Sequence, residues 1–327
     1  MKILKKSPEK DFVILNITDP QLDDVEWEDR YPHAPILIYT VTKLIEEVKP
    51  DLITVSGDLA CHGEFVSYRK FIDLMDSFEI PWAPIFGNHD HSFGNMDETV
   101  ELVAMLKASK YCLFEAGERA LGIGNYILRI EENGKPLHAI YMMDTHETWD
   151  WIEKDGTPWS EHDGIYPCQL EWYAQTVDQF KAEGGKESTL IMHIPTYSYN
   201  DAVTAAVKEG TDLKSVSTDE RLQDCWNEGY EDSFGVCHEG IGTPDEDDGF
   251  LELILEKDNT KTILVGHQHH NNLVTRYRGI THAYSLKTGR GCDWEPDLSG
   301  GTVLTIDGNG TLTLKHHYVD ASSVMKK

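Results

Sequence analysis

The stretch FVILNITDPQ, residues 12–21, shows the pattern that decides the fold: a continuous apolar run that ends in polar residues, here at Asp19. Four more apolar runs end in the same way. They are LITVS before Gly57-Asp58, WAPIF before Gly87-Asn88-His89-Asp90, TLIM before His193, and TILV before Gly266-His267-Gln268-His269-His270. Runs without polar alternation are typical of strands that are buried on both faces. Residues that bind metal ions or transfer protons therefore follow five predicted strands.

Two amphipathic segments separate the first three of these strands. Residues 35–48 and 64–78 have apolar side chains at helical spacing. The order strand–helix–strand–helix–strand predicts parallel strands joined by right-handed crossovers. Ligands of such sheets bind beyond the carboxyl ends of the strands, which is where we expect Asp19, Asp58 and Asn88.

The later part of the chain predicts a second sheet packed against the first. Its strands are expected at residues 125–130, 137–144, 280–286, 301–307 and 311–319. The first two of these flank Asn133-Gly134, which is a hairpin signal. We therefore expect one α/β sandwich domain over residues 1–327.

Two long segments fall between the predicted strands, at about 147–168 and about 196–249. Loops of this length in a compact domain are typically functional lids or disordered segments. We expect both to form a cap that shapes the substrate site. The first segment contains three tryptophans, Trp149, Trp151 and Trp159. They can stack on a ring of the substrate or pack the cap itself.

Composition narrows the class of protein. With 57 acidic and 29 basic residues, the formal net charge is −28. A field of that sign repels polyanions, so nucleic acid is not the expected partner. The apolar run at 12–18 is short and lacks a small-residue cleavage site, and no segment approaches the roughly 20 apolar residues of a membrane span. Six scattered cysteines without a CxxC pair favour reduced thiols and a cytoplasmic location.

The residue types at the strand ends suit divalent ions. Carboxylate, amide oxygen and imidazole together are ligands for Mn, Fe or Zn. Asp58 is the natural bridging ligand, because a Gly-Asp step lets the backbone turn sharply while the carboxylate points into the crevice. Two ions about 3.5–4 Å apart would activate water and clamp a phosphoryl group. His193 alone is explained by core hydrogen bonding and GNHD alone by a turn, but five such clusters in one chain indicate a metal centre.

The series D-x-Q (19–21), GD (57–58), GNHD (87–90), His193 and GHxH (266–269) resembles the calcineurin-like metallophosphoesterase superfamily. It is most similar to the purple-acid-phosphatase-like and small phosphodiesterase branches. The resemblance spans most of the chain and implies a four-layer α/β/β/α sandwich of two mixed sheets with flanking helices.

The resemblance also implies roles for individual residues. One metal ion would be held by Asp19, Asp58 and His269, and the other by Asp58, Asn88, His193 and His267. Asn88 is in addition a candidate contact for the substrate. His89, paired with Asp90, would be the catalytic group that contacts the phosphoryl group and protonates the leaving alkoxide, since an imidazole is suited to this near neutral pH.

The chain departs from the commonest family pattern at Gln21, where many relatives carry histidine. Gln21 can coordinate the first ion through its amide oxygen or bond a water molecule on that ion. The first ion is therefore expected to bind less tightly, or to be a harder Lewis acid such as Mn or Fe. Purple acid phosphatases have an iron-binding tyrosine three residues after the bridging aspartate. Cys61 stands there instead, as an inert thiol or, less expectedly, a ligand.

Further polar residues are weaker candidates. His62, His146 and Arg290 are candidate substrate contacts, although Arg290 lies in a glycine-flanked segment, TGRG, that also predicts a plain turn. Asp144 either lines the pocket or caps the next segment. His270 is expected to support the ligands or to lie on the surface.

The function expected from this pattern is hydrolysis of a small phosphomonoester or phosphodiester by a hydroxide that bridges two divalent ions. One alternative is a hydrolase of a non-phosphate ester or of a pyrophosphate bond. Another is a non-catalytic interaction scaffold on the same fold, against which His89 argues because such proteins lose this residue. The oligomeric state does not follow from the sequence.

Overall fold

The computed structural model describes residues 1–22, 33–60, 65–91, 96–152, 158–215 and 224–325. One sheet has five strands in the order β14-β13-β2-β3-β4. They are β2 (Phe12–Ile17), β3 (Leu52–Ser56), β4 (Trp82–Ile85), β13 (Gly300–Ile306) and β14 (Leu312–Tyr318). Strands β2, β3 and β4 are parallel, while β13 runs antiparallel to both of its neighbours.

A second sheet has seven strands in the order β1-β5-β6-β9-β10-β12-β11. They are β1 (Lys2–Lys6), β5 (Tyr126–Glu132), β6 (Lys135–Met142), β9 (Glu187–Ile191), β10 (Thr260–Val265), β11 (Val274–Tyr277) and β12 (Ile280–Tyr284). The central strands β6, β9, β10 and β12 are mutually parallel. Both sheets are therefore mixed, with parallel strands at the centre.

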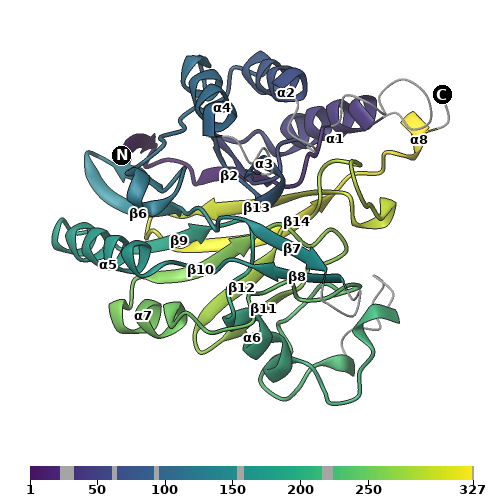
Figure 1. Ribbon diagram of the computed structural model, residues 1–327. Helices are drawn as coiled ribbons and strands as arrows, with labels where there is room; N and C mark the ends of the chain where they lie inside the picture. The colour runs from purple at the N-terminus through teal and green to yellow at the C-terminus, as the bar shows by residue number, and fades with distance from the viewer. Residues whose placement is uncertain (23–32, 61–64, 92–95, 153–157, 216–223, 326–327) are drawn as a thin grey trace.

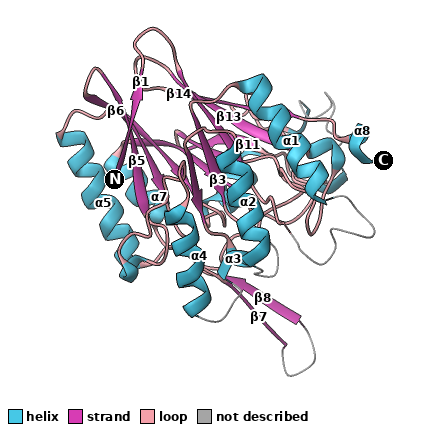
Figure 2. Cartoon of the chain, turned by 90° about the horizontal axis from the view of Figure 1, so that it is seen from above, coloured by secondary structure: helices cyan, strands magenta, loops and turns pink. Residues whose placement is uncertain are grey.

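Helices cover the outer face of each sheet (Figures 1 and 2). On the five-stranded side these are α1 (His33–Val48), α2 (Phe65–Ser77) and α4 (Met96–Ala108). On the seven-stranded side these are α5 (Pro167–Ala182), α6 (Ser198–Ala206) and α7 (Phe250–Lys257). Shorter pieces are α3 (Asn88–His91), α8 (Ser322–Met325), the 3₁₀ turns Arg119–Leu121, Leu213–Ser215 and Pro296–Leu298, and a separate hairpin of β7 (Thr148–Ile152) and β8 (Pro158–His162).

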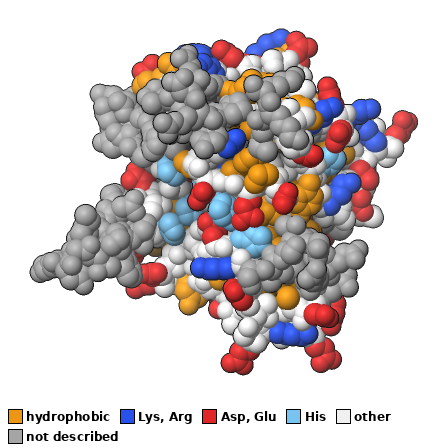
Figure 3. All heavy atoms as spheres, turned by 90° about the vertical axis from the view of Figure 1, so that its right-hand side faces the viewer, with side chains coloured by type: hydrophobic (Ala, Val, Ile, Leu, Met, Phe, Trp, Pro, Cys, Tyr) orange, Lys and Arg blue, Asp and Glu red, His pale blue; other side chains and the backbone are white. Residues whose placement is uncertain are grey.

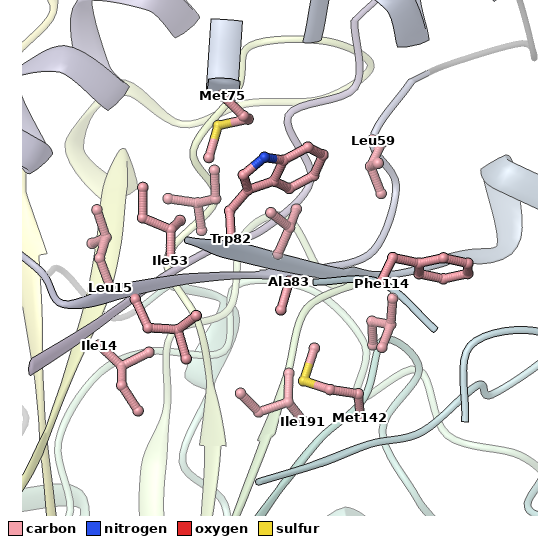
Figure 4. Packing of buried hydrophobic residues seen from close by; sticks show 14 of the residues in the cluster. Ile14, Leu15, Ile53, Leu59, Met75, Trp82, Ala83, Phe114, Met142 and Ile191 are labelled. Atoms are coloured by element: carbon pink, nitrogen blue, oxygen red, sulfur yellow. The ribbon is translucent and has the colours of Figure 1, made fainter. Parts of the chain in front are cut away.

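Two apolar cores hold these layers together. Neighbouring residues of one strand point to opposite faces, so Ile140 joins the core between the sheets and Tyr141 joins the core under α5. Figure 4 shows Ile14 of one sheet on the side of Met142 and Ile191 of the other sheet, while Leu15 and Ile53 lie on the opposite side with Met75 of α2. The expected four-layer α/β/β/α sandwich is confirmed.

The predicted helices 35–48 and 64–78 correspond to α1 and α2, and the parallel arrangement of β2, β3 and β4 is confirmed. The expectation that strands 301–307 and 311–319 join the second sheet is wrong. After β12 the chain crosses to the first sheet, and β13 pairs with the free edge of β2 in the register Val303↔Leu15. An open edge of a buried strand needs hydrogen-bond partners, and β13 supplies them.

Of the two segments expected to form a cap, the first includes a hairpin that forms a sheet of its own, whereas the second packs on the seven-stranded sheet through Tyr199 and Val203 of α6. The first contains the β7–β8 hairpin and the second contains α6, neither of which the sequence predicted. The interpretation as one domain with two cap segments stays a prediction. No helix in the described part of the chain has both the length and the apolar character needed to cross a bilayer. Cys112, Cys168, Cys225, Cys237 and Cys292 carry free thiols.

Candidate metal centre

The carboxyl ends of parallel strands from both sheets meet at one edge of the sandwich. In the face shown in Figure 3, histidine and acidic side chains gather near the middle. The residues that follow three of these strands have left-handed backbones, with φ of 49° at Asp19, 53° at Asp58 and 71° at His267. Such conformations are costly for residues other than glycine and concentrate at functional sites. They turn these three residues out of their strands into the shared crevice.

Asp19, Asp58 and His269 form one candidate metal position. Their ligand atoms all lie within 4.8 Å of one another. Both carboxylates are buried, and Asp19 Oδ1 lies 3.4 Å from His269 Nε2 yet accepts no hydrogen bond. A buried carboxylate oxygen without a hydrogen-bond partner is costly, and a cation removes that cost.

Asn88, His193 and His267 form the second candidate position beside Asp58. Asn88 Oδ1 lies 3.0 Å from His193 Nε2 and 3.0 Å from His267 Nδ1. His193 Nε2 is also 3.3 Å from Asp58 Oδ1, while its Nδ1 lies 2.8 Å from the carbonyl oxygen of Ser56. Since that carbonyl can only accept, Nδ1 carries the proton and Nε2 faces the cluster.

The electrostatics of the cluster favour charged carboxylates. Burial raises the pKa of Asp58, but the adjacent imidazoles, His193 first, outweigh it and hold the pKa well below its usual range. Burial likewise raises the pKa of Asp19, but its contact with His269 and the charges of His193 and Lys287 together outweigh that effect and lower the pKa. For His193, burial lowers the pKa, but the carboxylate of Asp58 raises it to about 9. The raised pKa of His193 and the lowered pKa of Asp58 have the same cause, the attraction between the imidazole and the carboxylate.

The space around the cluster also fits metal ions. A Cβ atom at Gly87 would lie 2.1 Å from Asp58 Oδ1 and 2.7 Å from His193 Nε2. Any larger residue at this position would therefore displace the two ligands. Oxygen and imidazole donors in this mixture suit Mn, Fe or Zn. The residues present thus fit a pair of divalent ions that share Asp58.

His89 lies at the mouth of the cluster. Its backbone N–H donates to Asp58 Oδ1 at 3.0 Å, and its Nε2 is 3.9 Å from Asp58 Oδ2. The side chain is 34% exposed, so it can reach a substrate as well as the cluster.

Asp90 is wholly buried, and its carboxylate accepts hydrogen bonds from the N–H groups of Leu59 and Gly87 and from the Tyr68 hydroxyl at 2.6 Å. Burial first, and then the charge of Asp58, raises the pKa of Asp90 to about 6. These contacts tie the loop after β3 to the loop after β4. Asp90 thus holds in place the loops that carry Asp58, Asn88 and His89.

Gln21 lies beside the first position, and its amide is engaged at both ends. Its Nε2 donates to Asp58 Oδ2 at 2.9 Å, and its Oε1 accepts from the ammonium of Lys287 at 2.5 Å. Arg290 stands close to the same loop with its guanidinium 5.2 Å from the centre of the Trp294 ring. Lys287 has no recognisable motif around it, so the sequence did not predict it.

The remaining candidates are placed as follows. Asp144 is buried and accepts from the N–H groups of Ile123 and His146, while the imidazole of His146 stacks on Tyr166 and lies 2.8 Å from Gln169 Oε1. These contacts hold Asp144 and His146 against the start of α5. The backbone N–H of His270 donates to Glu239, and its Nδ1 lies 3.5 Å from Glu295. His62, Cys61 and the side chains of Trp149, Trp151 and Trp159 lie outside the described residues.

The sequence interpretation missed His162, at the end of β8. Its Nε2 is 3.4 Å from His267 Nε2, and its Nδ1 is 2.9 Å from the Thr148 hydroxyl. With Nδ1 of His267 facing Asn88, its Nε2 is left to bond His162. The hairpin thereby reaches a candidate ligand. The only signal was a lone histidine in a segment without a strand-end motif.

Comparison with known families and proteins identifies the family and the fold. The family described as calcineurin-like phosphoesterase matches residues 12–271. A protein named probable inactive purple acid phosphatase 14, from Arabidopsis thaliana, is 24% identical over 312 residues, which cover 85% of this chain and 70% of that protein. A cAMP/cGMP dual specificity phosphodiesterase from Mycobacterium tuberculosis is 25% identical over 228 residues, or 64% of this chain and 61% of that protein.

Among solved structures, a dimetal phosphatase from Danio rerio superposes with a TM-score of 0.58 at 12% identity and covers 94% of this chain and 96% of its own. GAP50, the anchor in the inner membrane complex of Plasmodium, superposes with a TM-score of 0.52 at 14% identity and covers 94% of this chain and 84% of its own. At these identities the likeness establishes the fold.

Proposed function

Because this chain belongs to the calcineurin-like phosphoesterase family, we propose that it is a two-metal phosphoesterase that acts on a small phosphomonoester or phosphodiester. The observation that carries the proposal is that six donor side chains, from five strand ends in two sheets, gather in two adjoining groups that share Asp58. Those side chains are Asp19, Asp58, Asn88, His193, His267 and His269.

Two divalent ions held by these residues would activate water and neutralise the phosphoryl group of the substrate. Asp58 is suited to bridge them, because its Oδ1 faces His193 and its Oδ2 faces the side that carries Gln21. The neutral amide of Asn88 adds an oxygen ligand without adding negative charge, which favours approach of an anionic substrate.

His89 is suited to the proton transfer. Its place at the mouth, 3.9 Å from Asp58, lets the imidazole hydrogen bond to a phosphoryl oxygen or to the leaving alkoxide. Asp90, which ties together the two loops beneath, keeps His89 at that place. His146 and Arg290 stay candidate substrate contacts.

A small substrate is supported by the charge of −28, which disfavours polyanions. The two segments expected to form a cap, about 147–168 and about 196–249, are proposed to select it. A cytoplasmic location stays a prediction, in keeping with the free thiols.

The proposal is tested by metal analysis together with hydrolysis of para-nitrophenyl phosphate and bis-para-nitrophenyl phosphate, with and without added Mn. We expect metal-dependent release from one or both esters, and the ratio of the rates selects monoester or diester chemistry. His89→Ala should lose this activity while keeping its metal. The control is His317→Ala: His317 lies on β14 and pairs with Glu47 of α1, and this variant should keep both metal and activity. Bound metal without hydrolysis of either ester would contradict the proposal.

A non-catalytic role is the second candidate, because one relative is named probable inactive and one protein of similar fold is named an anchor. The presence of His89 beside Asp58 favours catalysis over that role. Hydrolysis of a pyrophosphate or non-phosphate ester bond would use the same residues, and a panel of such substrates in the same assay separates it from the main proposal.

A further inference from the structure

A buried lysine, Lys287, lies beside the first metal position, the one formed by Asp19, Asp58 and His269. Lys287 is only 1% exposed, and its ammonium lies 2.5 Å from Gln21 Oε1 and 3.2 Å from the backbone oxygen of Asp19. A lysine is rarely buried this fully, because removing its charge from water is costly. Its position beside a candidate metal ligand therefore has a consequence for metal binding.

The backbone fixes Lys287 where it is. Lys287 forms a parallel bridge with Thr18, and its carbonyl oxygen accepts from the N–H of Gly300 at 3.0 Å. The next residues pack directly on the loop that carries Gln21. A Cβ at Gly289 would lie 2.0 Å from the oxygen of Pro20. The segment that carries the lysine is therefore packed closely against the loop of the first position.

The side-chain amide of Gln21 is also held in place, by hydrogen bonds at both ends. Its Nε2 donates to Asp58 Oδ2, and its Oε1 accepts from Lys287, so neither end of the amide is available. For the amide oxygen to bind an ion at the first position, Gln21 must give up its hydrogen bond with Lys287. The ammonium of Lys287 would then lie close to a divalent cation, and the two positive charges would repel each other.

The second position lacks this obstacle. Asn88 Oδ1, His193 Nε2 and His267 Nδ1 already point to one place, with both imidazoles 3.0 Å from the amide oxygen. His193 is oriented by the Ser56 carbonyl and His267 by His162, as ligands oriented by outer hydrogen bonds usually are. An ion there meets ligands that need little rearrangement.

We propose that Lys287 and Gln21 make the Asp19–His269 position the weaker of the two, so that the protein holds one divalent ion firmly at Asn88, His193 and His267. The second ion then enters only at higher metal concentration. Lys287 compensates part of the negative charge of Asp19 and Asp58 while that position is empty. Availability of metal would thus regulate the enzyme, an inference that rests on the proposed two-metal function.

The test is a titration of the metal-free protein with Mn in the absence of substrate, followed by calorimetry. We expect two classes of site whose dissociation constants differ by about 10- to 100-fold, the range over which neighbouring groups change metal affinity. Asp19→Asn should weaken or remove the weaker class and keep the firm one. Two sites of equal affinity, or loss of the firm class in Asp19→Asn, would overturn the inference.

Lys287→Met removes the cation and should tighten the weaker class by about tenfold or more. The matched control is Lys6→Met. The Lys6 side chain on β1 is also 1% exposed, but it pairs with Glu132 of β5, so this variant should leave both dissociation constants unchanged. Lys287→Gln also removes the charge but keeps a hydrogen-bond donor toward Gln21, so it should likewise tighten the weaker class, even if Lys287→Met does not fold. Unchanged constants in these variants would reject the role of Lys287.

These outcomes separate the inference from the function beneath it. Hydrolysis with two equal sites leaves the proposed function standing and rejects the inference. Absence of any bound ion in the wild-type protein rejects the metal centre itself, and with it both proposals.

Discussion

Gly87 offers the sharpest test of the metal centre, because an alanine there alters the ligands without removing one. The backbone φ of Gly87 lies outside the left-handed region, so Gly87→Ala adds no backbone strain. Its effect comes from the added methyl group alone. That group would lie 2.1 Å from Asp58 Oδ1, 2.5 Å from the Asp58 nitrogen and 2.7 Å from His193 Nε2.

The magnitude follows from these distances. Ordinary contact begins at 3.4 Å, so the carboxylate oxygen must move by about 1.3 Å and the backbone nitrogen by about 0.9 Å. Overpacking of this kind costs about 1–3 kcal/mol of the free energy of unfolding. A displacement of about 1 Å at a catalytic site lowers the rate about 100-fold. Because Asp58 and His193 both move, metal affinity should fall as well.

The assay compares Gly87→Ala with Gly308→Ala. A Cβ at Gly308 meets no atom within 4 Å, so this control changes a glycine without a contact. Metal content, phosphatase rate and chemical denaturation are measured on both variants. We expect loss of metal and rate in Gly87→Ala alone. Wild-type metal content together with a wild-type rate in Gly87→Ala would refute the assigned geometry of Asp58 and His193.

Further predictions concern the ligands and the proton donor. His89→Ala should lower the turnover number by about 10²–10⁴-fold with metal content unchanged, and an unchanged rate would remove His89 from the mechanism. Asp58→Asn should lower metal content itself, so full two-metal content by elemental analysis would contradict its bridging role. The pKa of His193 is raised to about 9 by Asp58, and a protonated imidazole cannot coordinate, so metal affinity should rise with pH up to about pH 9 and one proton should be released per ion bound there. Calorimetry in buffers of different ionisation enthalpy counts that proton, and pH-independent binding would contradict the assignment. His162→Ala should weaken metal binding about 10- to 100-fold, since His162 orients His267, and an unchanged dissociation constant would show that this contact is incidental.

The sequence predicted those parts of the fold in which local pattern and tertiary role coincide. Strands β2, β3 and β4 are continuous apolar runs, and helices α1 and α2 have clear helical spacing. Strand β13 was assigned to the wrong sheet, because its apolar pattern fits either sheet. Only the open edge of β2 selects its partner, and that edge exists in three dimensions alone.

Elements with weak local patterns escaped prediction. Strand β1 contains three lysines in five residues and pairs with β5, far along the chain. The β7–β8 hairpin lies in a segment interpreted as a loop. In both cases pairing with a partner strand outweighs the propensity of the segment itself.

The sequence by itself determined which residues form the candidate metal centre, because strand-terminal Asp, Asn and His residues are brought together by the ends of parallel strands in any sheet of this kind. Tertiary structure alone decided what surrounds them. Lys287 reaches Gln21 because the chain after β12 crosses to pair with Thr18, and His162 reaches His267 because a hairpin folds over the strand ends. Contacts between segments more than 100 residues apart depend on the path of the chain, which no local pattern encodes.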